Sequence, residues 1–274
     1  MISVIVLTYN SKQTIEHTLR SALRVSDDVN VVDSFSTDET VRILERFPVT
    51  ITQRAFENYG LQRNWAIENL ALKYSWQLHL DADEYLSDSL IAELNSLKQN
   101  PPADIDGFLI PRKIRFLNRM LEHGGLYPTW HMRLFRGGRA RCELRQYDQH
   151  FILDGRSSRL RSPMIDDHQM SLSEWTARHN RWSDKEVDEV LSPQSDGIIR
   201  GRLLGGDIER KRALRGVYYG LPSFLRPFIL FFYRYVIRFG FLDGIPGLIY
   251  IVLQSFWYRF LVDAKRYERL SERR

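Results

Sequence analysis

The sequence predicts an α/β fold: a mostly parallel sheet with helices on both faces, followed by a helical C-terminal region. Two observations predict it. Short β-branched runs alternate with helical segments over the first hundred residues, and long aromatic-rich apolar runs broken by single arginines fill residues 216–262. A chain of 274 residues is long enough to bury a full hydrophobic core.

Four strands and four helices alternate as far as residue 99. The pattern predicts strands at 2–8, 29–34, 49–54 and 76–80, and helices at 11–23, 36–47, 59–74 and 86–99. Asn10 or Ser11 is available to cap the first helix. Ser36 or Thr37 can cap the second, where Glu39 is placed for a capping box. Each strand therefore leads directly into a helix, as in parallel sheets.

Beyond residue 104 this alternation stops. Residues 108–118 and 132–144 read as strands, and 171–191 as a mixed-charge helix or helix pair that covers an active site. We expect His179 and Arg181 of that segment to lie on the surface. The pattern favours a catalytic domain over residues 1–198, with a donor half at 1–104 and an acceptor half at 105–198, and a separate region at 199–274.

The composition excludes several classes of protein. Residues 200–274 carry a balance of +9 and the whole chain +5, which leaves −4 on residues 1–199. These basic residues lie between apolar runs instead of on a polar surface, so we expect no nucleic-acid partner. The single cysteine, Cys142, excludes an internal disulfide, and Met1 is followed at once by a core-like strand. Both features favour a cytoplasmic protein.

Three polar loops follow predicted strands: TYN at 8–10, DSFSTD at 33–38 and DADE at 81–84. Ligands of parallel sheets bind beyond the carboxyl ends of the strands, where these loops converge. Asp81 and Asp83 are two residues apart and point to the same side of extended backbone, which suits a hard divalent cation that also holds phosphate. The alternative is that Asp83 or Ser87 caps the next helix and the other carboxylates lie in water.

Four ordered blocks favour the cation. ISVIVLTYNSKQTIEHTLRSAL, VVDSFSTDETVRIL, GLQRNWAI and WQLHLDADEYLS resemble the successive motifs of family 2 glycosyltransferases with the GT-A fold, whose sheet is Rossmann-like. GGLYPTWHMRLFRGG and GFLDGIPGL resemble the small bacterial enzymes of that family that extend lipopolysaccharide core or other envelope glycans. The resemblance implies an inverting, metal-dependent transfer from a UDP-sugar.

The resemblance also implies roles at a donor site. Nucleotide-sugar binding falls to Thr8, Tyr9, Asn10, Asp33, Arg63 and Asp81. Asp33 would accept from the uracil ring N–H, although a turn residue is the alternative, and Arg63 would reach the diphosphate unless it is a solvated helix arginine. Asp83 would hold Mn²⁺ or Mg²⁺, with His168 as a further ligand or a packed side chain. No GxxxxGK or GxGxxG motif is present, which argues against a Walker or dinucleotide site.

An inverting transfer needs one general base near the acceptor hydroxyl. We favour Asp148, which shares a strand face with His150, and place Glu143 second; Asp154, Asp166 and Asp167 are further carboxylates in this part of the chain. Related enzymes often carry a His-Glu pair here, whereas this sequence has Tyr147-Asp148-Gln149-His150. The acceptor would contact three further side chains, although the first of them could equally be core: Trp130, Arg133 and His150.

The C-terminal region predicts membrane association. Arg226, Arg234 and Arg238 fall within a third of the circumference of a helix at 223–241, and the remaining face is Phe, Ile, Leu and Tyr. The longest uncharged stretch, 244–258, is shorter than the roughly 20 residues that span a bilayer. The alternative is a helix that packs on the catalytic domain or on a second subunit in a homo-oligomer.

We therefore predict a peripheral, monotopic enzyme on the cytoplasmic face of a bacterial inner membrane. Its acceptor would be a lipopolysaccharide core or another lipid-linked glycan. A polyprenyl-phosphate glycosyltransferase is the alternative within the same class. From another class comes a non-catalytic scaffold that keeps the fold and the membrane region, against which the intact Asp33, Asp81 and Asp83 argue.

Overall fold

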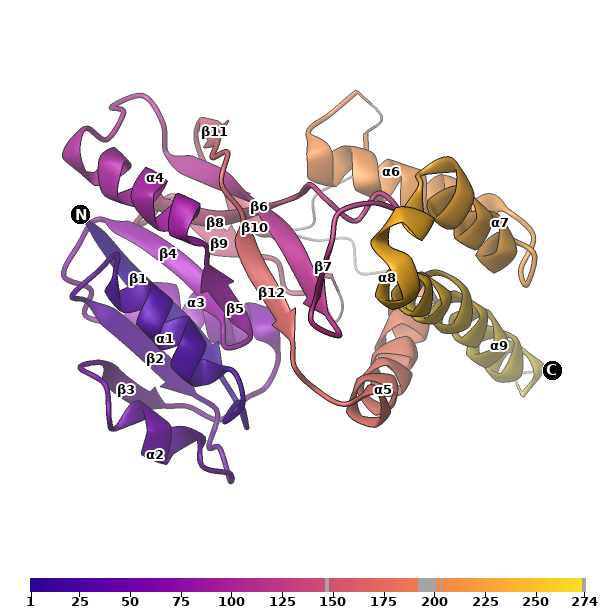
Figure 1. The fold of residues 1–274 in the computed structure, drawn as a ribbon, viewed down its shortest axis with the longest axis horizontal. Coiled ribbons are helices and arrows are strands. Elements are labelled where there is room, and N and C mark those ends of the chain that lie inside the picture. Colours follow the sequence, from indigo (N-terminus) through magenta and orange to yellow (C-terminus); the bar gives the residue numbers. More distant parts are fainter. Residues whose placement is uncertain (146–147, 192–200, 203, 273–274) are drawn as a thin grey trace. The chain divides into compact units, whose positions relative to one another are not determined.

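The computed structural model describes residues 1–145, 148–191, 201–202 and 204–272 (Figure 1). The chain forms two compact units. The first contains Met1–Arg115, Thr129–Leu144 and Gln149–Gln169, and the second contains Phe116–Pro128, Arg145–Asp148 and Met170–Arg274. The predicted domain boundary between residues 198 and 199 lies outside the described residues, so that boundary stays a prediction.

The first unit is built on a sheet with the strand order β3-β2-β1-β4-β8-β6-β12-β5. β1 pairs in parallel with β2 and β4, and β2 with β3, which confirms the predicted parallel core. β8 runs antiparallel to β4 and β6, β12 antiparallel to β5, and β11 parallel to β6. The bounds are β1 Ile2–Thr8, β2 Val29–Asp33, β3 Thr50–Gln53, β4 Trp76–Asp81, β5 Glu84–Leu86, β6 Gly107–Phe116, β8 Thr129–Arg136, β11 Ser157–Arg159 and β12 Met164–His168. A separate antiparallel pair is formed by β9 Ala140–Cys142 and β10 Phe151–Leu153.

Helices cover both faces of this sheet, as the alternating pattern predicts. The helices are α1 Ile15–Leu23, α2 Thr40–Leu44, α3 Tyr59–Asn69 and α4 Asp88–Gln99. One face of the sheet packs on Ile15, Leu19, Leu44, Leu90 and Leu94 from α1, α2 and α4. The other face packs on α3 through Ala66, against Ile5, Leu7 and Val32. Every β1 side chain is buried, so β1 is apolar on both faces apart from Ser3 and Thr8 and does not alternate.

Two helix starts differ from the prediction. α1 begins at Ile15, where Ser11 supplies a carbonyl to the amides of Thr14 and Ile15 but no side-chain cap is formed. α2 begins only at Thr40, so the capping box predicted from Ser36 or Thr37 with Glu39 is wrong. The physical reason is that the Ser36 hydroxyl donates to Asp33 instead of serving the helix.

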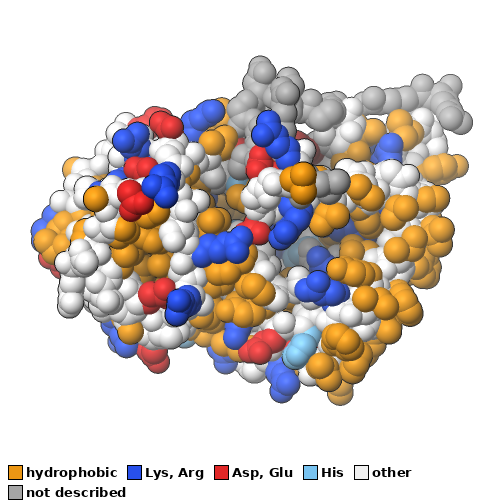
Figure 2. Space-filling model, turned by 90° about the horizontal axis from the view of Figure 1, so that it is seen from above, with side chains coloured by type: hydrophobic (Ala, Val, Ile, Leu, Met, Phe, Trp, Pro, Cys, Tyr) orange, Lys and Arg blue, Asp and Glu red, His pale blue; other side chains and the backbone are white. Residues whose placement is uncertain are grey.

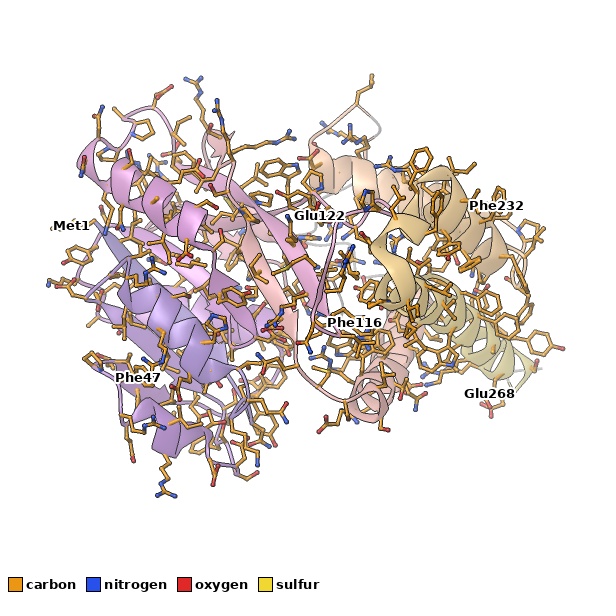
Figure 3. The ribbon with its side chains drawn as sticks, viewed as in Figure 1. Met1, Phe47, Phe116, Glu122, Phe232 and Glu268 are labelled. Atoms are coloured by element: carbon orange, nitrogen blue, oxygen red, sulfur yellow. The ribbon has the colours of Figure 1, made fainter. Side chains whose placement is uncertain are left out.

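The second unit is helical. Its elements are β7 Arg119–Leu121, α5 Leu172–Leu191, α6 Asp207–Gly220, α7 Arg226–Phe232, η1 Tyr233–Ile237, η2 Gly240–Asp243, α8 Gly244–Ile251, η3 Val252–Trp257 and α9 Tyr258–Ser271. Phe116 packs on Trp175 of α5 and on Tyr250 of α8, with ring centroids 6.5 and 5.1 Å away (Figure 3). α5 is one helix, not a pair, and the prediction of a surface His179 is wrong: its ring is buried and stacks on Trp175 at 3.4 Å. Arg181 is exposed, as predicted.

A buried carboxylate joins the early and late segments of this unit. Oδ2 of Asp243 accepts from the backbone amides of Glu122 and His123 at 3.0 and 2.9 Å, and its Oδ1 lies 2.7 Å from Nδ1 of His123. The amide of Gly124 donates to the carbonyl of Arg238 at 2.9 Å, and Gly124 adopts φ +67°, which favours glycine. The 116–128 segment is therefore an integral part of the helical unit.

The predicted arginine face of the 223–241 helix is wrong at its first position. Arg226 is fully buried and paired with Asp263 of α9, and Arg234 donates to the hydroxyl of Ser255 at 3.1 Å. Arg238 alone of the three predicted arginines is exposed. Aromatic and aliphatic side chains occupy the exposed side instead, and Figure 2 shows apolar side chains gathered over part of this unit.

One helical run is long and apolar enough to cross a membrane by length and composition. It covers Gly240–Ser271, 32 residues, and includes η2, α8, η3 and α9. The uncharged stretch 244–258, by itself shorter than a bilayer span, is therefore part of a longer helical run.

Candidate functional site

Three neighbouring parallel strands bring the predicted donor residues to one edge of the sheet. In the register of β1 with its neighbours, Thr8 pairs with Asp33 and Leu7 pairs with Asp81. Asp33 and Asp81 thus end the strands on either side of β1, as the sequence predicts. The side chain of Thr8 is buried, and among the described residues its Oγ1 has no hydrogen-bond partner. Tyr9 beyond it is 58% exposed.

Asp33 organises the loops at this edge. It is fully buried, and its carboxylate accepts from the amide and hydroxyl of Ser36, at 3.0 and 2.5 Å, and from Nε2 of Gln53 at 3.2 Å. Ser36 in turn accepts from the Asn10 amide at 2.9 Å, and the Asn10 side chain accepts from the Thr37 amide at 2.8 Å. A carboxylate has about four lone-pair sites, so Asp33 keeps capacity for one more donor. Its contact with a nucleotide base stays a prediction.

Asp81 lies between two arginines. Nη2 of Arg63, from α3, donates to its Oδ1 at 2.6 Å, and Nη2 of Arg133, from β8, donates to its Oδ2 at 2.8 Å. Burial alone would raise the pKa of Asp81, but these two guanidiniums outweigh it and lower the pKa to about 2. Both arginines are themselves less than a tenth exposed. Arg63 is therefore not a solvated helix arginine, and Asp81 is a fixed anion at neutral pH.

Glu84 completes this cluster, although the sequence analysis assigned it no role. Its Oε1 accepts from Nη2 of Arg133 at 2.6 Å, and its Oε2 accepts from the backbone amide of Asp81 at 3.0 Å. Burial and the carboxylates of Asp81 and Asp166 raise the pKa of Glu84 to about 7, against the opposing charge of Arg133. Arg133, predicted to contact the acceptor, is thus buried between two carboxylates; its acceptor role stays a prediction.

Of the predicted metal ligands, Asp83 lies in the turn between β4 and β5, and His168 ends β12. β5 and β12 align Glu84 with Asp166, and the amide of Asp167 donates to the carbonyl of Asp83 at 2.8 Å. Asp83 is half-buried. Of the two residues named as a possible cap for α4, Ser87 caps the helix, by accepting from the amide of Leu90 at 3.2 Å. His168, on the same strand as Asp166, places Nε2 3.0 Å from its Oδ1.

The predicted metal ligands fit a divalent cation only in part. Across the described ranges, no group of three or more His, Cys, Asp or Glu side chains is arranged to hold an ion. A cation held by Asp83 would therefore complete its shell with diphosphate oxygens and water, which is how Mg²⁺ is commonly bound. Asp166 also pairs with Nη1 of Arg112 at 3.2 Å, so its charge is already shared.

Glu143, the second candidate base, closes the β9–β10 hairpin in the first unit. The hairpin register continues through Glu143 and His150, whose backbones pair at 3.0 Å, and the buried Glu143 carboxylate accepts from the His150 amide at 2.9 Å. The hairpin rests on α3. Asn64 accepts from the amide of Cys142 and donates to its carbonyl, and Gly60 faces the Glu143 carbonyl so closely that no Cβ would fit. α3 thus holds both Arg63 and Glu143 in place.

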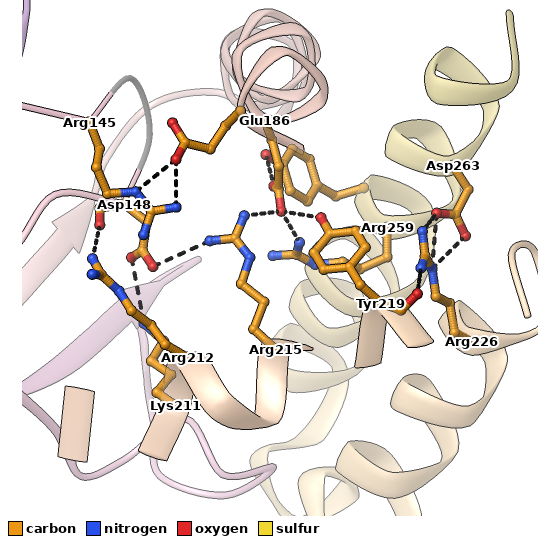
Figure 4. Close-up of polar contacts among 12 residues, drawn as sticks. Arg145, Asp148, Glu186, Lys211, Arg212, Arg215, Tyr219, Arg226, Arg259 and Asp263 are labelled. Carbon is orange, nitrogen blue, oxygen red and sulfur yellow. Dashed lines mark hydrogen bonds and ion pairs between the residues drawn. The ribbon is translucent and has the colours of Figure 1, made fainter. Parts of the chain in front are cut away.

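Asp148, the favoured base, belongs to the second unit. Its carboxylate lies 3.7 Å from Nζ of Lys211 and 3.5 Å from Nη1 of Arg215, and its carbonyl accepts from Arg212 at 3.3 Å (Figure 4). The residue adopts φ +56°, a strained region for a residue with a Cβ. Its charge is engaged by α6, and its role as a base stays a prediction.

Trp130 and His150 are the remaining predicted acceptor residues. Trp130 is half-buried on β8, with the guanidinium of Arg159 4.8 Å from its ring centroid. The buried ring of His150 lies 6.1 Å from that of His131. Neither arrangement identifies a sugar, so both acceptor roles stay predictions.

Comparisons with known proteins agree with this geometry. The model of the family "Glycosyl transferase family 2" matches residues 3–161, more than half of the chain. An uncharacterized glycosyltransferase of Rickettsia conorii is 36% identical over 93 residues, which are 34% of this chain and 32% of the relative. A second, from Rickettsia bellii, is 37% identical over the same length and is covered to 31%. The match thus spans about a third of the length of these relatives.

Solved structures share the fold. Staphylococcus aureus TarS 1-349 in complex with UDP-GlcNAc aligns with a TM-score of 0.50 at 15% identity, over 98% of this chain and 91% of that one. The mannosyltransferase PcManGT of Pyrobaculum calidifontis, in complex with GDP-Man and Mn²⁺, aligns with a TM-score of 0.51 at 15% identity, over 97% and 86%. The mostly parallel sheet with helices on both faces is therefore a GT-A fold.

Proposed function

Because the chain belongs to glycosyl transferase family 2, we propose that it transfers a sugar from a UDP-sugar to a hydroxyl of a lipid-linked or lipopolysaccharide-core acceptor, with inversion at the anomeric carbon. The observation that carries the donor half of this proposal is the convergence of Thr8, Asp33 and Asp81 on three adjacent strand ends. In open α/β sheets this edge is where ligands bind.

The charges at this edge suit a nucleoside diphosphate. Arg63 and Arg133 converge on Asp81, and within the described chain Nη1 of Arg63 is buried without a hydrogen-bond partner. An unsatisfied buried donor costs about 1–3 kcal/mol, which an anionic ligand would recover. The unpartnered hydroxyl of Thr8 lies on the adjacent strand and would serve the nucleoside. These groups bind and orient the donor.

The reaction itself is a single displacement. The acceptor oxygen forms a bond to the anomeric carbon as the bond from that carbon to the diphosphate breaks, and the electron pair leaves with UDP. The hydroxyl proton passes to a carboxylate, Glu143 or Asp148. Asp83, with His168 as a further ligand, would hold Mn²⁺ or Mg²⁺, and the cation would supply positive charge for the departing diphosphate.

A lipid-linked acceptor is supported by the C-terminal unit. Its exposed aromatic and aliphatic side chains favour a location on a membrane, which we propose is the cytoplasmic face of the bacterial inner membrane. A polyprenyl phosphate as the acceptor is the alternative within this class. A non-catalytic scaffold is disfavoured by the buried Asp81 cluster, whose Arg63 Nη1 is unpartnered in the part of the chain that the structure describes, because such a cluster is costly to keep without a ligand to bind.

Titration calorimetry tests the donor site. The full chain in mild detergent is titrated with UDP, first with Mn²⁺ and then with EDTA, and with GDP and CDP as controls. We expect UDP to bind selectively and at least about tenfold more tightly with the metal, a difference of roughly 1.4 kcal/mol. Selective binding of GDP would keep the fold but replace the proposed donor, and binding of no nucleotide would leave the scaffold reading.

A variant pair tests the metal. Asp83→Asn should remove the difference between Mn²⁺ and EDTA, because it removes the carboxylate that holds the cation. Asp88→Asn is the matched control: Asp88 is 87% exposed, in a surface ion pair with Arg24, and should behave as the wild type. Unchanged metal dependence in Asp83→Asn would overturn the metal assignment.

A further inference from the structure

An exposed apolar surface covers one side of the second unit. It consists of side chains that are each between 36% and 73% exposed: Phe224, Leu225, Phe228, Ile229, Phe232, Tyr233, Val236, Ile237, Phe239, Phe241, Leu242 and Ile245. All twelve come from one stretch of 22 residues that includes α7, η1 and η2. Figure 3 shows Phe232 pointing away from the helices. Large exposed apolar patches of this kind mark interaction surfaces.

Three of the four charged side chains of the same stretch face inward, and the fourth, Arg238, is exposed. Arg226 is buried against Asp263, Arg234 donates to Ser255, and Asp243 is buried against the 122–124 backbone. Of the twelve side chains on the surface, only Tyr233 carries a polar atom. Most of the hydrogen-bonding side chains of this stretch therefore point away from the exposed apolar surface.

We infer that this apolar surface inserts into the interfacial layer of a lipid bilayer that contains anionic phospholipid. An interface with another protein carries roughly one hydrogen bond per 100–200 Å², and this surface has almost no side chain that could form such a bond. Half of its side chains are aromatic, five Phe and one Tyr, and Phe and Leu are residues that form the apolar face of helices lying in the membrane interface.

The charges around the surface select the lipid. Between Leu221 and Trp257 the only acidic residue is Asp243, which is buried, whereas Arg238 at the end of η1 is exposed. Arg238 is thus the one exposed charge in this described stretch, and a basic residue is attracted to a negatively charged bilayer, at roughly 1 kcal/mol near its surface.

The contacts of the Gly240–Ser271 run favour lying on the membrane over crossing it. Tyr258 and Val262 are buried against Val187 of α5, and Lys265 pairs with Asp184 at 2.7 Å. α5 is rich in charged residues and is held along α9 by these contacts. A run that crossed the bilayer would carry this charged helix with it, which hydrocarbon does not tolerate. The apolar surface precedes these contacts and is free of them.

Vesicle flotation of the full chain tests the inference, which rests on the proposed membrane location. Wild type is mixed with vesicles of phosphatidylethanolamine and phosphatidylglycerol, or of phosphatidylcholine alone, at low and high salt. The triple variant Phe228→Ser, Phe232→Ser, Ile237→Ser removes three side chains that are each more than half exposed. We expect its partition into anionic vesicles to fall at least tenfold, because each side chain loses apolar burial in lipid.

The matched control is Leu172→Ser, Leu214→Ser, Leu270→Ser, which removes three exposed leucines from α5, α6 and α9. It should float as the wild type does. Arg238→Gln should weaken binding to anionic vesicles and leave binding to phosphatidylcholine unchanged. Phe232→Trp adds a reporter whose emission should shift to the blue and be quenched by brominated lipid tails.

Two outcomes would overturn the inference. One is equal flotation of the two triple variants. The other is a wild-type dimer in sedimentation that becomes monomeric in the first triple variant, because this surface would then bind a second copy of the chain. UDP titration of the same variants separates this inference from the proposed function. If a variant loses flotation but still binds UDP, the result bears on the apolar surface alone. If the wild type floats but does not bind UDP, the result contradicts the proposed donor site and leaves the membrane inference intact.

Discussion

The buried pair of Arg226 and Asp263 gives the most quantitative test of the helical unit. The arginine is fully buried, the aspartate is 2% exposed, and Nε of Arg226 donates to both carboxylate oxygens at 3.0 and 3.1 Å. Nη1 donates to the carbonyl of Tyr219 at 3.0 Å, and the guanidinium lies 4.5 Å from that ring centroid. One side chain thus ties the end of α6 and the start of α7 to α9.

Arg226→Met keeps the volume of the side chain and removes its charge. Asp263 would then be a buried carboxylate whose remaining contact is the Phe224 amide at 3.0 Å. Breaking a buried pair on one side costs about 3–5 kcal/mol. With an m-value of about 2–3 kcal/mol/M, the urea midpoint of this unit should fall by more than about 1 M.

The double variant Arg226→Met, Asp263→Leu is the matched control. It removes both charges, and replacing a buried pair by apolar side chains is often close to neutral. We expect it to lie within about 1 kcal/mol of the wild type. The free energy of unfolding is measured by urea titration in detergent with tryptophan fluorescence, which reads Trp175, Trp182 and Trp257 in this unit. A loss below about 1 kcal/mol in the single variant, or a double variant as unstable as the single, would refute the reasoning.

Three further predictions concern other buried groups. Burial would raise the pKa of Glu186, but two arginines and two tyrosines outweigh it and lower the pKa to about 2. Its carboxylate therefore contributes about 3 kcal/mol to the free energy of unfolding above pH 4.5, and this contribution is lost as the pH falls toward 2. Glu186→Gln should remove this acid dependence from urea titrations at pH 3 and 7, and an unchanged difference would contradict the cause. Arg133→Met should lower the free energy of unfolding by about 3–5 kcal/mol and weaken UDP binding, because it leaves the carboxylates of Asp81 and Glu84 without the cation between them. Arg133→Lys should recover part of the stability and part of the UDP affinity. Wild-type stability in Arg133→Met would disprove the role of Arg133 in this cluster. Gly60→Ala should displace α3 from the hairpin, because its Cβ would overlap the carbonyl of Glu143, and an unchanged melting temperature with unchanged UDP affinity would show that this contact is not tight.

The sequence predicts the first half of the fold because its signals are local there. Each strand of the parallel core is a short, largely apolar run, β-branched in β1, β2 and β3, and is followed by a helical period. The polar residues that end β2 and β4 reach the same edge by topology alone. Asp33 and Asp81 were therefore placed correctly before any contact was known. Ser36 shows the limit of that reasoning, since its hydroxyl was assigned to a helix end but donates to Asp33.

Residues whose partners are distant in the chain were beyond prediction. Periodicity predicts that Arg226 and Arg234 share one face of a helix, but it does not predict whether that face is buried or exposed. For Arg226 this is decided by Asp263, 37 residues later. His179 followed a mixed-charge pattern that predicts exposure, yet the ring of Trp175 four residues earlier covers it. The partners of Glu84 are Arg133 of β8, 49 residues on, and the backbone amide of Asp81 at the end of β4.

The helical unit is assembled from three separate stretches of the chain, Phe116–Pro128, Arg145–Asp148 and Met170–Arg274, and this affects how the protein can be divided. A fragment cut near residue 198 would keep Glu122, His123 and Gly124 but lose Asp243 and the carbonyl of Arg238, to which they bind. The last quarter of the sequence is therefore not an interchangeable module. Removing the last quarter of the chain should leave exposed, unpaired backbone at residues 122–124, in the middle of the remaining chain. The same obstacle opposes the exchange of C-terminal regions between relatives during evolution.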